Sequence, residues 1–117
     1  MILDWVHFET FKSAREAFTA RPCIYVVVGE GEELLFVGET GDLWRRYDNG
    51  TAPIVEATLA NRAIYVAEAP ADMRERRYIV RTLLYRYGPV NGLDPTSLGR
   101  IRLIEIEHRG EVPPPFV

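Results

Sequence analysis

Hydrophobic residues in the first third of the chain follow two different patterns, one periodic and one continuous. Apolar residues three and four positions apart predict a helix over residues 10–19, with Thr10 as its N-cap. The continuous apolar run Cys23–Val28 is rich in β-branched residues, which is typical of a buried strand. A glycine-rich turn at 29–32 and a second apolar run at 34–38 then predict a β-hairpin.

The rest of the chain continues to alternate between helical and extended patterns. Further helices are expected over residues 40–48, 53–60 and 72–87, strands over 62–68 and 100–107, and a polyproline-like tail at 113–115. The order of these elements predicts an α+β fold, in which an antiparallel or mixed sheet of three to four strands is flanked by helices.

Composition narrows the class of protein. The 117 residues amount to one domain, and the chain is 47% hydrophobic and 26% charged, as in ordinary globular proteins. The single cysteine, Cys23, excludes an intrachain disulfide framework and any multi-cysteine metal site. Uninterrupted aliphatic runs are far shorter than the roughly 20 residues of a membrane helix. We therefore expect a cytoplasmic protein with no membrane partner.

The charge is unevenly distributed. The net charge of −3 argues against a protein that binds polyanions over its whole surface. However, the 14 basic residues are thirteen Arg and a single Lys, and nine of them lie in residues 59–117 against seven acidic residues. Arginine suits bidentate contacts to phosphate. A GC-rich genome, which encodes basic residues mostly as arginine, also explains the preference for arginine over lysine.

A set of motifs lies on the hairpin and the helix after it. The letters CIY at 23–25 are followed, ten residues later, by FVG at 36–38 and then by ETGDLWRR. This run resembles the GIY-YIG nuclease superfamily, in which GIY and YIG lie on two adjacent strands and G-x-T-x-x-L-x-x-R leads into a helix. LL at 83–84 and PVN at 89–91 resemble the closing element of the family. The resemblance implies a GIY-YIG-like core over about 21–92, with the helix 10–19 and the strand 100–107 as additions.

The resemblance implies hydrolysis of a phosphodiester in DNA or structured RNA. Tyr25 would be the general base and Arg46 would stabilise the charge that develops on the phosphate. Asn91 would lie near the site, and Thr40 and Arg45 would contact phosphate at the start of the helix. From the residues alone, Tyr25 also fits a core aromatic in a strand, and Arg46 also fits a solvated surface charge.

Two further motif positions concern the hairpin. Gly38 ends the second apolar run, and a glycine there lets a ligand approach the backbone closely. Phe36 stands where the family's second motif has Tyr, so a hydroxyl group is absent.

The metal ligand of the family is missing. Nucleases of the family carry a Glu on the long helix, nine residues before the closing Pro, which ligates a divalent ion, usually Mg²⁺. That position is Val80, which has no oxygen to offer a hard cation. Glu39, directly after Gly38, is the alternative carboxylate. We therefore expect Mg²⁺ only if the protein is active.

The long helix also carries a row of basic residues. Arg74, Arg77 and Arg81 fall on one arc of the helical wheel together with Tyr78 and Tyr85. Basic groups between aromatic rings are able to follow a phosphate backbone and stack on bases, although an exposed charged helix face has the same pattern.

Two functions follow from these motifs. One is a DNA- or RNA-directed endonuclease or nickase, weakened or silenced by the missing Glu. The other is a catalytically inactive module of the same fold that binds nucleic acid or protein. A chain of this size has no room for a separate targeting domain, so a protein partner or a homodimer is compatible with both.

Overall fold

The computed structural model describes residues 1–48, 63–88 and 102–117. Within them, five strands form one mixed sheet in the order β3-β2-β4-β1-β5. The strands are β1 (Ile2–Phe8), β2 (Cys23–Val28), β3 (Leu34–Thr40), β4 (Ala63–Glu68) and β5 (Glu107–Gly110). All neighbouring strands are antiparallel except β1 and β5, which are parallel. The helices are α1 (Phe11–Ala17), α2 (Leu43–Asp48), α4 (Met73–Tyr87) and a 3₁₀ turn, η2 (Pro114–Phe116). The α+β class is therefore confirmed.

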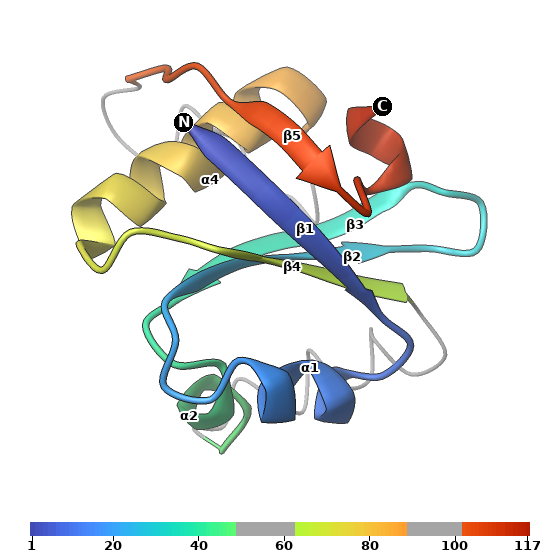
Figure 1. The fold of residues 1–117 in the computed structure, drawn as a ribbon. Helices are drawn as coiled ribbons and strands as arrows, with labels where there is room; N and C mark the ends of the chain where they lie inside the picture. The colour runs from blue at the N-terminus through green and yellow to red at the C-terminus, as the bar shows by residue number, and fades with distance from the viewer. Residues whose placement is uncertain (49–62, 89–101) are drawn as a thin grey trace.

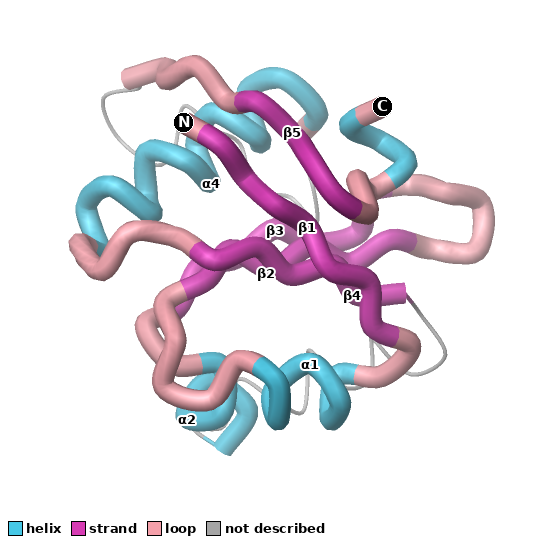
Figure 2. The backbone as a smooth tube through the Cα atoms, in the orientation of Figure 1, coloured by secondary structure: helices cyan, strands magenta, loops and turns pink. Residues whose placement is uncertain are grey.

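The helices cover the two faces of the sheet unequally. Figures 1 and 2 show α4 on one face and the short helices α1 and α2 on the other. Two core clusters fill these layers, and the interior strand β2 contributes alternate side chains to both: Ile24 to the α4 side and Tyr25 to the α1–α2 side. A strand buried on both faces is uniformly apolar, which explains the run CIYVVV.

Local capping explains where the helices begin and end. The Thr10 hydroxyl accepts a hydrogen bond from the Ser13 amide at 3.1 Å, and the Asp72 carboxylate accepts one from the Arg74 amide at 2.8 Å. Gly88 follows the last turn of α4 and donates its amide to the Leu84 carbonyl. The predicted helices over 10–19 and 72–87 are thus confirmed. The predicted helix over 53–60 lies outside the described residues.

The N-terminal strand is missing from the sequence-based prediction. Residues Ile2–Phe8 form β1, which lies between β4 and β5, so the sheet has five strands where three to four were expected. The side chains of Leu3 and Trp5 are buried while Asp4 and Val6 are exposed. This alternation of burial is typical of a half-buried strand, but the sequence obscures it, because the exposed residues Ile2 and Val6 are also apolar.

The C-terminal strand was placed too early. Within the described residues it begins at Glu107 and not near residue 100. The reason lies in its partner, because β5 pairs in parallel with β1 and the register starts at Ile2↔Glu107. Before this pair, the Met1 amino group donates a hydrogen bond to the Glu105 carbonyl.

The proline tail was also predicted wrongly. Instead of a polyproline-like end, it forms a 3₁₀ turn, because Phe116 is buried against Trp5 and Tyr87. His108 completes this aromatic cluster and accepts a hydrogen bond at Nδ1 from the Trp5 indole Nε1, at 3.0 Å. The C-terminus is therefore fixed to the α4 side of the sheet. Among the described helices, none has the length and apolarity needed to cross a bilayer.

This aromatic cluster predicts a specific acid sensitivity. Burial, aided by the positive charge of Arg86, lowers the pKa of His108 below its ordinary 6.5. The unfolded chain therefore binds a proton more readily than the folded one, so stability is complete above about pH 6.5 and falls as the pH drops through the lowered pKa. Protonation also places a hydrogen on Nδ1, facing the indole donor.

We expect the free energy of unfolding, measured by urea titration, to fall more between pH 7.5 and pH 5 in the wild type than in His108→Gln. The glutamine does not titrate, and the carboxylates common to both proteins cancel in the comparison. An equal fall in both proteins would contradict this role of His108.

Candidate functional site

The motif hairpin brings Tyr25 and Gly38 together as a cross-strand pair. The Tyr25 side chain is fully buried on the α1–α2 side of the sheet. Its ring stacks on Phe36 with centroids 5.7 Å apart and meets the edge of Phe11 at 6.3 Å. A general base has to reach the water that it deprotonates. In this structure, Tyr25 is enclosed by aromatic rings.

Gly38 makes room for that ring. A Cβ atom at Gly38 would lie 2.5 Å from Tyr25 Cζ and 2.6 Å from its hydroxyl oxygen, which is inside van der Waals contact. The group that approaches the backbone at this glycine is therefore Tyr25 itself. Gly38 and Phe36 thus both serve to pack the Tyr25 ring in the hairpin: the glycine leaves space for it, and the phenylalanine stacks on it.

The side chains of the loop that leads into α2 make hydrogen bonds to backbone groups at the start of the helix. The Thr40 hydroxyl accepts a hydrogen bond from the Asp42 amide at 3.2 Å and donates one to the Asp42 carbonyl at 3.1 Å. The Asp42 carboxylate then accepts hydrogen bonds from the amides of Trp44 and Ala20, both at 3.0 Å. A carboxylate thus lies where the resemblance expects phosphate, and it repels a second anion.

The arginines of α2 are only partly described. Arg45 is exposed on the helix. Arg46 follows it, but its side chain lies outside the part of the structure that is described, as does the whole of Asn91. The expected convergence of Tyr25, Arg46 and Asn91 therefore stays a prediction.

Glu39 lies on the other face of the sheet, against α4. Its carboxylate accepts a hydrogen bond from Arg76 Nε at 2.7 Å, and both side chains are largely buried. Arg76 also donates through Nη1 to the carbonyls of Pro70 and Ala71, at 3.0 and 2.6 Å. The ion pair thus joins the end of β3 to the first turn of α4.

Arg76 was not singled out from the sequence. It precedes Ile79 by three residues and Leu83 by seven, which places it on the buried face of α4. That spacing is the signal by which it could have been found.

The described residues do not fit the Mg²⁺ site of the resembled family. Val80 is half-buried and packs on the α4-side core, whereas Tyr25 belongs to the cluster on the opposite face of the sheet. Glu39 is neutralised by Arg76. In the described ranges, no three His, Cys, Asp or Glu side chains gather closely enough to hold a metal ion.

Cys23 offers no nucleophile either. It is fully buried, and this burial raises the pKa of its thiol to about 12, against the opposing influence of Arg76 and Arg21. The thiol is therefore protonated at neutral pH and unreactive.

The outer face of α4 is basic and open to solvent. Arg74 and Arg77 are exposed, Arg81 is half-buried and Tyr85 is 56% exposed. The structure thus brings the three predicted arginines onto one exposed face, away from Tyr25.

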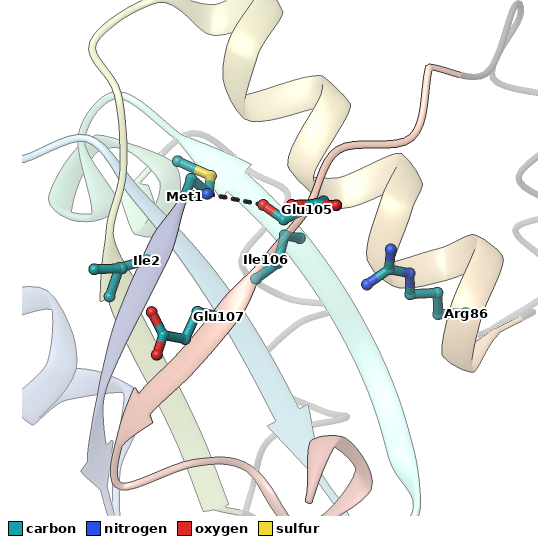
Figure 3. Close-up of a pocket in the computed structure, with 6 residues that line it drawn as sticks. All are labelled: Met1, Ile2, Arg86, Glu105, Ile106 and Glu107. Carbon is teal, nitrogen blue, oxygen red and sulfur yellow. Dashed lines mark hydrogen bonds between the residues drawn. The ribbon is translucent and has the colours of Figure 1, made fainter.

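Two pockets lie where α4 approaches the segment that leads into β5, and Met1 lines both of them. One, of about 430 Å³, is lined by Arg86 at the C-terminal end of the helix together with Glu105 and Glu107 (Figure 3). The other, of about 600 Å³, lies against the N-terminal half of the helix, at Arg74 and Tyr78. The second pocket thus adjoins the row of arginines.

Comparison with protein-family models, with curated proteins and with solved structures gave no match. The GIY-YIG resemblance therefore rests on the motifs quoted above.

The Tyr25–Gly38 pair predicts a steric effect at one glycine. Gly38→Ala should lower the free energy of unfolding by about 1–3 kcal/mol, because the added methyl group overlaps the Tyr25 ring. The loss should shrink in a Tyr25→Leu background. Gly41→Ala is the control, since its Cβ would lie 3.6 Å from the nearest atom, Arg76 Nη2. Equal effects at the two glycines in chemical denaturation would contradict this packing.

The buried ion pair predicts a larger loss than a surface pair at the same end of the sheet. Glu39→Ala should destabilise the protein by about 3 kcal/mol, because it leaves Arg76 buried without its carboxylate. Glu68→Ala removes a carboxylate that lies 3.4 Å from Arg21 on the surface and should cost less than about 1 kcal/mol. Similar losses in urea titrations of the two variants would show that the Glu39 pair is not a structural anchor.

Proposed function

We propose that this chain is a GIY-YIG-like module that binds nucleic acid through the outer face of α4 and does not hydrolyse it. The observation that carries the proposal is the division of α4 into two faces. Ile79 and Leu83 lie in the core, while Arg74, Arg77 and Arg81 point away from it. The arginines face outward on a helix whose opposite side is firmly packed.

The spacing of the arginines suits a phosphate backbone. Arg74 and Arg81 are seven residues apart, which corresponds to about 10 Å along a helix. Because the phosphates of one DNA strand follow each other at about 3.4 Å along the duplex axis, three arginines over this length contact two or three phosphates. The net charge of −3 confines the binding to this face and makes it sensitive to salt.

Three observations support a loss of hydrolysis. Tyr25 is enclosed, Glu39 is paired with Arg76, and Val80 stands at the position of the metal ligand. A weak Mg²⁺-dependent endonuclease is the second candidate, favoured by the match of the hairpin and α2 to the motif order. Either would act on DNA or structured RNA in the cytoplasm, with a protein partner or a second copy adding specificity.

The binding half of the proposal is tested with a labelled DNA duplex and a labelled single strand. Replacing Arg77 and Arg81 together by Ala should weaken binding about tenfold at ~50 mM salt and lower the salt slope by about 2, because two phosphate contacts are lost. Arg86→Ala is the matched control, since Arg86 is exposed on the same helix but outside this row. An equal loss of affinity in the control would show that the three arginines act only through the overall surface charge.

The catalytic half is tested with supercoiled plasmid in Mg²⁺ or Mn²⁺. Neither the wild type nor Val80→Glu should nick it, because Val80 and Tyr25 lie on opposite faces of the sheet. Wild-type nicking that is lost in Arg46→Ala would establish the endonuclease instead.

A further inference from the structure

The larger pocket is a groove with a defined wall on each side. One wall is the first half of α4, with Arg74, Glu75 and Tyr78, and the other is the segment at Arg102, Leu103 and Glu105. The buried Thr82 hydroxyl fixes this second wall to the helix, because it accepts a hydrogen bond from the Ile104 amide at 3.2 Å. The volume of about 600 Å³ falls within the range of small-ligand sites.

The groove presents an arginine guanidinium beside a tyrosine ring. The guanidinium of Arg102 lies over the Tyr78 ring, 5.5 Å from its centroid. Guanidinium planes and tyrosine rings are both surfaces on which nucleobases stack. Leu103, which is 46% exposed, adds an apolar edge.

Carboxylates line the same groove. Asp72 caps α4 by accepting from the Arg74 amide, and Glu75 and Glu105 also line the groove. Arg74, Arg102 and the amino group of Met1 also line the groove, so three positive groups balance the three carboxylates. The lining as a whole therefore gives no net attraction to a phosphate, whereas its carboxylates accept hydrogen bonds from amino groups.

We propose that this groove holds a single unpaired nucleobase that carries an exocyclic amino group, while the phosphates next to it lie on the arginines of α4. This inference rests on the proposed function and adds the kind of strand that is bound. Arg74 belongs both to the row of arginines and to the lining of the groove, so the two sites are continuous. Since the bases of a duplex are stacked inside it, the groove selects single-stranded or unpaired segments.

A peptide cation is the competing occupant, because carboxylates and a tyrosine ring also attract cations. Arg102 already covers the Tyr78 ring, and Arg74 lines the same space. A second cation would lie against two guanidinium groups, whereas a neutral planar base stacks on them. The arrangement thus favours the base.

The test compares 15-nucleotide oligo(dC) and oligo(dT) by fluorescence anisotropy at pH 7.5 and ~50 mM salt. Cytosine offers an amino group to Glu75 and thymine does not, so the full chain should bind oligo(dC) about fivefold more tightly. Glu75→Ala should remove this preference. Glu16→Ala deletes the same charge from the exposed surface of α1 and should keep the preference.

Stacking is tested separately at Tyr78. Tyr78→Leu should weaken oligo(dC) binding about fivefold or more, and Tyr78→Phe, which keeps the ring, should restore it. Thermal melts of both variants check that the helix is intact.

The other outcomes distinguish a failure of the groove from a failure of the proposed function. Equal binding of oligo(dC) and oligo(dT), still dependent on Arg77 and Arg81, would overturn the groove and keep the proposed function. If neither oligonucleotide binds while the duplex still binds through Arg77 and Arg81, the groove is overturned and the proposed function stands; if the duplex also fails to bind, the proposed function itself is overturned. A lysine-rich peptide that binds in a Glu75-dependent manner and displaces oligo(dC) would replace the base by a peptide.

Discussion

The buried ion pair between Glu39 and Arg76 is the interaction on which the rest of the structure depends. It joins the C-terminal end of β3 to the first turn of α4. Arg76 also donates hydrogen bonds to the carbonyls of Pro70 and Ala71, in the loop before the helix. A buried charge is tolerated only when it is paired and its hydrogen bonds are made. The pair therefore fixes which side of α4 faces the sheet.

Two consequences for function follow from this orientation. With Arg76 turned inward, Arg74, Arg77 and Arg81 are turned away from the core, and the basic face of the helix is open. At the same time the carboxylate closest in sequence to the motif glycine is neutralised. The contact that anchors the helix thus engages the carboxylate that the sequence suggested as a metal ligand, and it exposes the arginines on the outer face.

Much of the fold could be predicted from local patterns, and the site could not. The bounds of β2 and α4 follow from an apolar run and from caps, which are properties of neighbouring residues. The start of β5 depends instead on where β1 begins, a hundred residues earlier. The pairing of Glu39 with Arg76 is likewise a tertiary contact, so motif spacing alone left Glu39 available for a metal ion.

Under the proposed function, nucleic acid binds the outer face of α4 and does not contact the face of the sheet that carries Tyr25. Amide chemical shifts of the ¹⁵N-labelled protein, followed during titration with a short single-stranded oligonucleotide, test it most directly. We expect shifts confined to Arg74, Arg77, Arg81 and the neighbouring segment at Arg102. Shifts centred on Thr40 and Arg45, with α4 unchanged, would contradict it.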